Sequence, residues 1–290
     1  MSAQAQTTTR LDSPRVVRNQ LSLNNESEEV VLAGRALMQR AISGQEDGLL
    51  VMVGQQAAND MVSVREFSKV LQRLGATYEL QCVPMVFYPQ LDVYASRRFL
   101  LEAIKAGLGV CAEVSNAFIH SYVDDLLSIA LLRDHAYLED EDGDAPNSGL
   151  ASGISAPFGL ESTRRELKSA IRAVNESGLA STFYGINGDG RSALLNTGGN
   201  NHGFIMVSDA ANPITVRRAS AFLSGLKIPH MAKIQVGDSE QDLTSLEMLL
   251  RTSVSMWRES KNMFGVYLYC ASETDLLDYL FRYLHEELAK

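Results

Sequence analysis

Residues 49–60, LLVMVGQQAAND, decide the fold class. The run begins with five apolar residues, is closed by Gly54, and continues in polar residues. Such a run is typical of a parallel strand that is buried on both faces. It is followed by residues 62–75, VSVREFSKVLQRLG, in which apolar residues recur at helical spacing. Residues 49–75 therefore predict one strand followed by one amphipathic helix.

The same rhythm continues along the chain. Further strand-like runs cover residues 82–87, 110–114, 153–158, 180–186, 203–208, 232–237 and 264–270. Helical patterns cover residues 30–42, 95–109, 122–132, 162–178, 215–226, 243–257 and 273–288. About eight β-then-α units in roughly 250 residues predict an α/β protein of the (β/α)8 TIM-barrel class. We expect residues 28–290 to form the barrel and the polar residues 1–27 to form a flexible N-terminal arm.

A doubly wound open sheet is the alternative fold. It is disfavoured because the first strand ends in GQQAAND and not in a glycine-rich phosphate turn. A long acidic segment at residues 135–153 interrupts the rhythm. Its spacing does not match an EF-hand loop, so we expect a solvated surface loop.

Composition excludes several classes of function. The 290 residues are 46% hydrophobic and 21% charged, as in ordinary soluble globular proteins. The net charge of -9 argues against nucleic-acid partners and against an anionic membrane surface. No apolar stretch reaches the about 18 residues that span a membrane, and the N-terminus lacks the apolar core of a secretory signal. We therefore expect a cytoplasmic protein.

The three cysteines, Cys82, Cys111 and Cys270, all lie inside apolar runs. They are too few and too scattered for a disulfide framework or a cysteine-based zinc site. We expect them to be buried, reduced thiols.

In a TIM barrel the reactive groups lie at the C-terminal ends of the strands. Glu113 is the most informative of them, because a carboxylate inside an apolar strand costs several kcal/mol unless it is paired or hydrogen-bonded. A functional and a structural role are equally open for it. Asp238 is either reactive or the N-cap of the next helix, and residues 196–201 form either a tight turn or a phosphate-binding nest.

Four strings resemble the class I 3-deoxy-D-arabino-heptulosonate 7-phosphate (DAHP) synthases in the same order. They are residues 44–60, residues 97–128, residues 150–162, LASGISAPFGLES, and residues 191–201, RSALLNTGGNN. The resemblance runs from about residue 30 to the C-terminus. It implies a (β/α)8 barrel, a homodimer or homotetramer, and a metal-dependent condensation of phosphoenolpyruvate with erythrose 4-phosphate.

The positions of the family's ligands have changed in this chain. The metal-binding Cys, His and Glu of the family fall on Gln56, Asp238 and Tyr269, and the segment with the last ligand, an Asp, is missing. A phosphate-binding Lys falls on Glu161, while Glu113 keeps the family's residue. Two charges about 4 Å apart interact by about 4 kcal/mol at an effective dielectric near 20, so the exchange of this Lys for Glu161 is enough to abolish phosphate binding. These departures from the family's pattern therefore predict that the chain lacks DAHP synthase activity and uses neither the metal nor any other cofactor.

Two classes of function remain open. The first is a repurposed enzyme of specialised metabolism, in which a duplicated primary enzyme has acquired a new reaction. It would act on a small molecule that is cationic or neutral and carries no phosphate. Its general base would be Glu113 or Asp238, and Tyr269 would donate a hydrogen bond. The expected substrate-binding residues are Gln56, Asp60, Tyr88, His135, Glu161 and Asn196. The second class is an inactive pseudoenzyme that binds a partner or a ligand. A true DAHP synthase of the shikimate pathway is the least favoured alternative.

Overall fold

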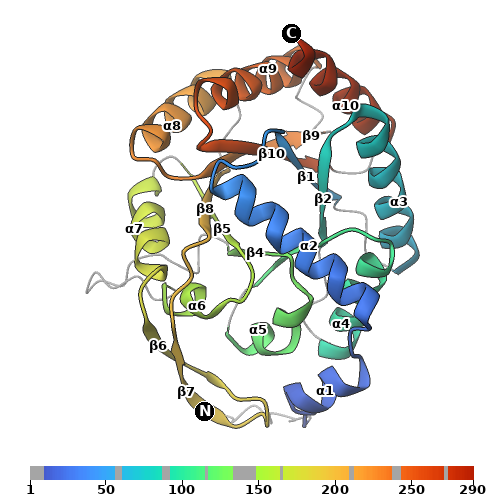
Figure 1. Ribbon diagram of the computed structural model, residues 1–290, viewed down its shortest axis with the longest axis vertical. Coiled ribbons are helices and arrows are strands. Elements are labelled where there is room, and N and C mark those ends of the chain that lie inside the picture. The colour runs from blue at the N-terminus through green and yellow to red at the C-terminus, as the bar shows by residue number, and fades with distance from the viewer. Residues whose placement is uncertain are drawn as a thin grey trace, which may run out of the picture.

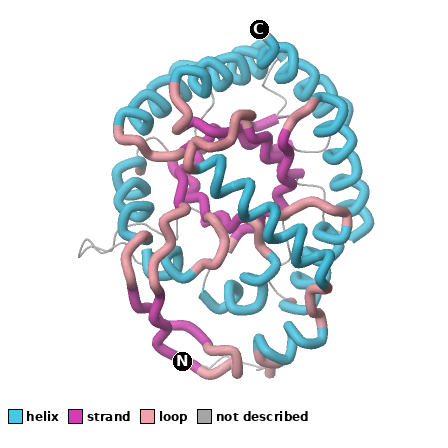
Figure 2. The backbone as a smooth tube through the Cα atoms, in the orientation of Figure 1, coloured by secondary structure: helices cyan, strands magenta, loops and turns pink. Residues whose placement is uncertain are grey.

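The protein folds as a closed barrel of eight parallel strands surrounded by helices (Figures 1 and 2). The computed structural model describes residues 10–55, 61–86, 92–114, 117–132, 148–163, 166–208, 212–236, 243–270 and 274–290. The strand order around the barrel is β1-β10-β9-β8-β5-β4-β3-β2, and neighbouring strands are parallel. This arrangement confirms the predicted TIM-barrel class.

The barrel strands are β1 (Leu50–Gln55), β2 (Gln81–Val86), β3 (Cys111–Glu113), β4 (Ile129–Leu132), β5 (Phe158–Ser162), β8 (Gly203–Val207), β9 (His230–Val236) and β10 (Met263–Cys270). The helices are α1 (Pro14–Gln20), α2 (Asn25–Ile42), α3 (Met61–Tyr78), α4 (Val93–Lys105), α5 (Ala117–Val123), α6 (Ser148–Gly153), α7 (Leu167–Ser177), α8 (Pro213–Gly225), α9 (Leu243–Glu259) and α10 (Thr274–Ala289). None of these helices, as far as the structure describes them, is long and apolar enough to cross a membrane.

The sequence prediction was wrong for residues 122–132, which we expected to be helical. Helix α5 ends at Val123, a short 3-10 turn follows at Asp124–Leu126, and residues 129–132 form the fully buried strand β4. Tertiary contacts end the helix: the Asp125 carboxylate binds Arg97, and the Asp124 carboxylate accepts hydrogen bonds from Ser155. A short apolar run fits a strand as well as a helix, so its periodicity alone could not decide.

The prediction of a barrel strand at residues 180–186 was also wrong. Strand β6 (Ser181–Ile186) pairs antiparallel with β7 (Ser192–Thr197) in a separate two-stranded hairpin beside the barrel (Figure 1). Exposed and half-buried residues alternate along both strands, whereas the barrel strands β4, β5 and β8 are buried throughout. Only one face of the hairpin packs against the rest of the protein, so half-buried and exposed side chains alternate along its strands.

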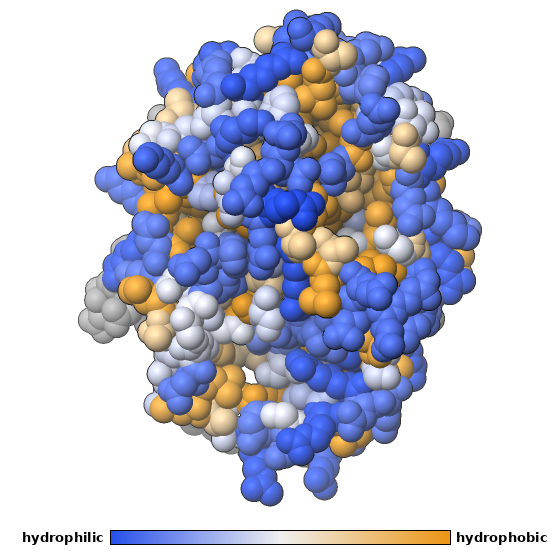
Figure 3. Space-filling model, viewed as in Figure 1, coloured by the Kyte–Doolittle hydropathy of each residue, from blue (hydrophilic) through white to orange (hydrophobic). Residues whose placement is uncertain are grey.

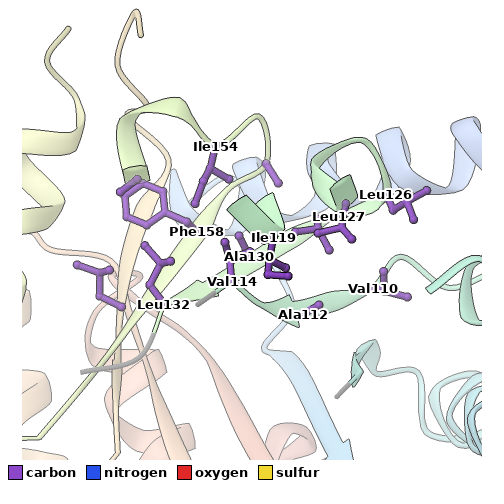
Figure 4. Packing of buried hydrophobic residues seen from close by; sticks show 14 of the residues in the cluster. Val110, Ala112, Val114, Ile119, Leu126, Leu127, Ala130, Leu132, Ile154 and Phe158 are labelled. Atoms are coloured by element: carbon purple, nitrogen blue, oxygen red, sulfur yellow. The ribbon is translucent and has the colours of Figure 1, made fainter. Parts of the chain in front are cut away.

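The side chains of each barrel strand alternate between an outer shell and the interior. In β1, Val51 and Val53 pack against the helices, whereas Leu50 and Met52 point inward. Figure 4 shows part of the outer shell, where residues of β3, β4 and β5 pack against Ile119 of α5. Once one side chain of a strand is known to point inward, the side chains two and four residues away point inward as well.

Large interior side chains lie over glycines of other strands. A Cβ atom at Gly54 would come 2.3 Å from the hydroxyl of Tyr267, and one at Gly159 would come 2.5 Å from the ring of Phe204. Any side chain at either glycine would therefore displace an aromatic ring from the interior. The glycine expected to close the first strand thus has a packing reason, although β1 continues to Gln55.

Helix α2 closes the N-terminal end of the barrel and crosses it in Figure 1. Met38, Ala41 and Ile42 on this helix belong to the same buried cluster as Leu50 and Met52 of β1. Burial of apolar side chains from a helix and from the strands in one cluster holds α2 in place. The helix begins at its N-cap Asn24, whose side chain accepts a hydrogen bond from the Ser27 backbone.

The N-terminal segment is tied to the barrel by a buried arginine. Arg97 on α4 has no solvent-exposed surface and donates to the carbonyl oxygens of Leu21 and Tyr122. It also binds both carboxylate oxygens of Asp125, at 2.7 and 2.6 Å. The segment between α1 and α2 is thus fixed to α4 and α5. The flexibility that we expect of the arm, residues 1–27, stays a prediction, and its first nine residues lie outside the described part of the chain.

We predict that Arg97→Ala lowers the free energy of unfolding by about 3 kcal/mol. The substitution leaves the partly buried carboxylate of Asp125 and two backbone carbonyl oxygens without their donor. Urea unfolding measures this change, and Arg98→Ala on the exposed side of α4 is the matched control, with an expected change below about 0.5 kcal/mol. Equal effects of the two substitutions would contradict the assignment of Arg97 as a structural tie.

A second prediction concerns His230, which is buried at the start of β9 between the Ser220 hydroxyl and the Ile228 carbonyl oxygen. Burial lowers the pKa of His230 to about 4, although the hydrogen bond to Ile228 acts in the opposite direction. The unfolded chain therefore binds a proton more readily than the folded protein does. The free energy of unfolding should be highest above about pH 6.5, the approximate pKa of histidine in the unfolded chain. It should decrease by about 3 kcal/mol as the pH falls toward 4.

The measurement is urea unfolding at several pH values between 7 and 4. The wild-type protein and a His285→Gln control, altered at an exposed histidine, should share this pH dependence, and His230→Gln should lack it. If all three proteins lose stability in parallel, His230 is not the source.

Candidate active site at the C-terminal end of the barrel

An ion pair lies inside the barrel between two strands that are not neighbours. The Nζ atom of Lys233 on β9 is 2.5 Å from Oε1 of Glu161 on β5. Strand β8 separates β5 from β9, so the two side chains meet across its inner face. The alternation agrees, because Met231 belongs to the interior cluster, whereas Ala232 and Ile234 pack outward. Glu161 is the penultimate residue of β5, and Lys233 follows Ala232, which is paired with the last residue of β8, Val207. Both side chains therefore lie toward the C-terminal end of the barrel, where TIM-barrel enzymes hold their substrates.

The two charges depend on each other. Only 18% of the Lys233 side chain and 12% of the Glu161 side chain are exposed. Removing one charge would leave the other largely desolvated, which is costly in a protein interior. The negative charge that Glu161 brings to this end of the barrel is therefore balanced locally by Lys233. This end of the barrel therefore carries less net negative charge than the acidic residues at the predicted strand ends indicate.

Two tyrosines of β10 complete the surroundings of the amine. In the strand register Tyr267 lies opposite Lys233, and Tyr269 lies opposite Gln235. The ring centroids of Tyr267 and Tyr269 are 5.7 and 5.3 Å from Nζ of Lys233. Aromatic faces at this distance stabilise a cation electrostatically. The predicted site residue Tyr269 thus lies beside Lys233, and its role as a hydrogen-bond donor stays a prediction.

Glu113 lies at the C-terminal end of β3 and is half-buried. It alternates with Cys111 of the interior cluster, so it faces the same interior. In the strand register it lies opposite Leu131 of β4, which is also an interior residue. The structure therefore brings Glu113, Glu161 and Tyr269 to one end of the barrel, as the sequence predicts.

Sequence reasoning missed Lys233. The residue lies inside the apolar run of residues 231–236, MAKIQV. The same signal, a charge inside a buried strand, identified Glu113. Applied to this strand, it would have identified Lys233, although only the structure identifies its partner Glu161. Five other predicted residues lie outside the described part of the chain: Gln56, Asp60, Tyr88, His135 and Asp238.

The expectation that Asn196 contributes to the barrel site needs correction. Asn196 lies on β7 of the hairpin and accepts a hydrogen bond from Thr182 of β6, at 3.0 Å. It lines a separate cavity of about 560 Å³ between α1, α5 and the hairpin, together with Arg18 and His120. A hollow is visible there in the lower part of Figure 3. Because the hairpin is not part of the barrel, the structure does not bring Asn196 together with Glu161.

The residues in the described interior do not fit the metal that the sequence resemblance implies. No group of three His, Cys, Asp or Glu side chains able to hold a metal ion occurs in the described part of the chain. The position of one family ligand is occupied by Tyr269, and the Lys233 ammonium lies over its ring. A positive charge at that position repels a divalent cation.

The cysteines are reduced, and their thiols are not nucleophilic. Burial raises the pKa of Cys82 and of Cys270 to about 12 and also raises that of Cys111. Cys111 and Cys270 are buried as predicted, and Cys82 is partly exposed. Only the thiolate is an effective nucleophile or metal ligand, and these thiols stay protonated at neutral pH.

We predict that Lys233→Met alone lowers the free energy of unfolding by about 3 kcal/mol, because it leaves the Glu161 carboxylate buried and unpaired. The double variant Lys233→Met/Glu161→Leu should recover most of that loss. Chemical unfolding of the two single variants and the double variant measures the coupling between the residues. If the single effects simply add, the ion pair does not exist in solution.

Comparisons with known proteins agree with this architecture, although no family model matches the chain. The Phe-sensitive phospho-2-dehydro-3-deoxyheptonate aldolase of Escherichia coli is 24% identical over 265 residues, which cover 81% of this chain and 70% of that protein. A putative aldolase of the same name from Schizosaccharomyces pombe is 25% identical over 217 residues, which cover 65% of this chain and 57% of that protein.

A solved structure is similar over almost the whole length. The phospho-2-dehydro-3-deoxyheptonate aldolase from Francisella tularensis superposes with a TM-score of 0.84 at 17% identity, and the match covers 99% of both chains. This likeness by itself concerns the fold. Taken with the sequence matches to enzymes of the same name, it supports membership of this chain in the class I DAHP synthase family.

Proposed function

We propose that this DAHP synthase homologue uses the C-terminal end of its barrel for a metal-independent reaction on a small molecule that carries no phosphate. The observation that supports this proposal is the contact of 2.5 Å between Glu161 and Lys233 inside the barrel. The pair lies where TIM-barrel enzymes bind their substrates. At the position where the family has a phosphate-binding Lys, this chain has Glu161, whose charge is neutralised by Lys233.

A phosphate group is a poor ligand for such an interior. It carries close to two negative charges and needs several convergent cationic donors. Lys233 already donates to Glu161, and the other carboxylate at this end, Glu113, would repel an anion. A neutral or cationic molecule avoids both costs.

The same side chains offer roles in a reaction without a metal. Glu113 is a candidate general base, and Tyr269 is a candidate hydrogen-bond donor to the substrate. Asp238, the alternative base, and the expected binding residues Gln56, Asp60, Tyr88 and His135 belong to the same proposal. Operation in specialised metabolism, a cytoplasmic location and a homodimeric or homotetrameric state remain predictions.

A second candidate is an inactive homologue that binds a ligand. The cavity beside the hairpin favours it, because Arg18, His120 and Asn196 line a space of about 560 Å³ outside the barrel. In that case a ligand would bind to the protein without depending on Glu161 or Lys233.

A thermal-shift screen with neutral, cationic and phosphorylated metabolites separates the two candidates. A ligand at about 100 times its Kd adds about 2.7 kcal/mol, which raises the Tm of a chain of this size by about 4 °C. We expect such a shift from a molecule without phosphate, and we expect Lys233→Met/Glu161→Leu to abolish it. A shift that survives in this variant but is lost in Arg18→Ala/Asn196→Ala would favour the inactive homologue.

The parental activity is measured on the same protein. Purified protein supplied with Mn²⁺, phosphoenolpyruvate and erythrose 4-phosphate should not consume phosphoenolpyruvate. Consumption that depends on Mn²⁺ would overturn the proposed function.

A further inference from the structure

We propose that Lys233 is a nucleophile that forms an imine with the carbonyl group of an uncharged aldehyde or ketone, and that Glu161 carries the proton. This inference rests on the proposed function, because it names the substrate class of the same site. The features that support it are the short contact between the two side chains, their shared burial, and the two tyrosine rings beside the amine.

An amine attacks a carbonyl only after it has lost a proton. Oε1 of Glu161 lies 2.5 Å from Nζ of Lys233, so the proton can move directly between the two atoms. This transfer converts an ion pair into a neutral pair without changing the net charge.

The reaction balances with the groups present. Nζ of Lys233 forms a bond to the carbonyl carbon, one of the two hydrogens of the neutral amine passes to the carbonyl oxygen, and that oxygen becomes a hydroxyl group. That hydroxyl leaves as water after it takes a proton from Glu161, and a C=N bond replaces the C=O bond. Lys233 ends as a protonated imine and Glu161 ends again as a carboxylate, so no oxidant, reductant or metal is consumed.

The surroundings suit the product as well as the starting amine. The protonated imine keeps the positive charge of the ammonium, and it faces the Glu161 carboxylate and the rings of Tyr267 and Tyr269. The Glu161 carboxylate beside the reacting carbon disfavours an anionic substrate, and the positive charge of the protonated imine disfavours a cationic one. The substrate is therefore an uncharged carbonyl compound. The purely structural alternative is weaker, because apolar residues of similar volume usually stabilise an interior as well as a buried ion pair does.

Reductive trapping tests the inference. The full-length protein is incubated with dihydroxyacetone, an uncharged ketone, and then reduced with sodium borohydride. Mass spectrometry should show an added mass equal to dihydroxyacetone less one oxygen atom, on the peptide that contains Lys233. Lys233→Arg keeps the positive charge opposite Glu161 but cannot be trapped, so labelling of that peptide should disappear.

Two further variants make the result specific. Lys168→Arg, altered at an exposed residue of α7, should be labelled like the wild-type protein. Glu161→Gln should slow trapping at Lys233 by about 100-fold, since it removes the proton carrier. Labelling of Lys233 no faster than that of Lys168 in the wild-type protein would overturn the inference.

The failure of this inference and the failure of the proposed function are distinguishable. A Tm shift that requires Lys233 and Glu161 but is accompanied by no trapped adduct would overturn only the imine. Mn²⁺-dependent consumption of phosphoenolpyruvate would overturn the proposed function itself.

Discussion

A charged carboxylate can remain in the interior of a closed barrel only when it is paired or hydrogen-bonded there. Glu161 meets Lys233 across the inner face of β8, and most of the surface of both side chains is removed from water. The approach depends on the barrel, because β5 and β9 have no direct backbone contact with each other. The chemistry proposed for this end of the barrel follows from that pair: the charge of Glu161 is balanced, an amine lies beside a proton acceptor, and Lys233 is already engaged and is not free to bind a phosphate.

The scaffold holds the pair by packing that involves few polar groups. Helix α2 covers the N-terminal end of the barrel with Met38, Ala41 and Ile42. The absence of a side chain at Gly54 leaves room for Tyr267, which lies opposite Lys233 in the strand register. The position of the Tyr267 ring beside the amine therefore depends on the missing side chain at Gly54.

The strand and helix rhythm of the sequence was sufficient to predict the barrel, because buried parallel strands are continuously apolar. It did not assign every strand correctly. Residues 129–132 resemble a helix until the contacts of Asp124 and Asp125 with distant residues are known, and residues 181–186 resemble a barrel strand although they pair only with β7. The first error involves contacts between residues about 30 positions apart, which a local pattern does not contain. The second involves a local hairpin, in which Ile186 pairs with Ser192, and an apolar run alone does not say which strand it pairs with.

The candidate site was predictable in part for the same reason. A charge inside an apolar strand identified Glu113, and the family resemblance identified Glu161 and Tyr269, but the partnership of Glu161 with Lys233 joins residues 72 positions apart. Asn196 was misplaced because the hairpin had been assigned to the barrel. A crystal structure of the protein grown with Mn²⁺ and phosphoenolpyruvate is the most direct measurement of the central claim. The account predicts that Lys233 still contacts Glu161 and that neither ligand is bound at the barrel, whereas both ligands held there with the ion pair broken would contradict it.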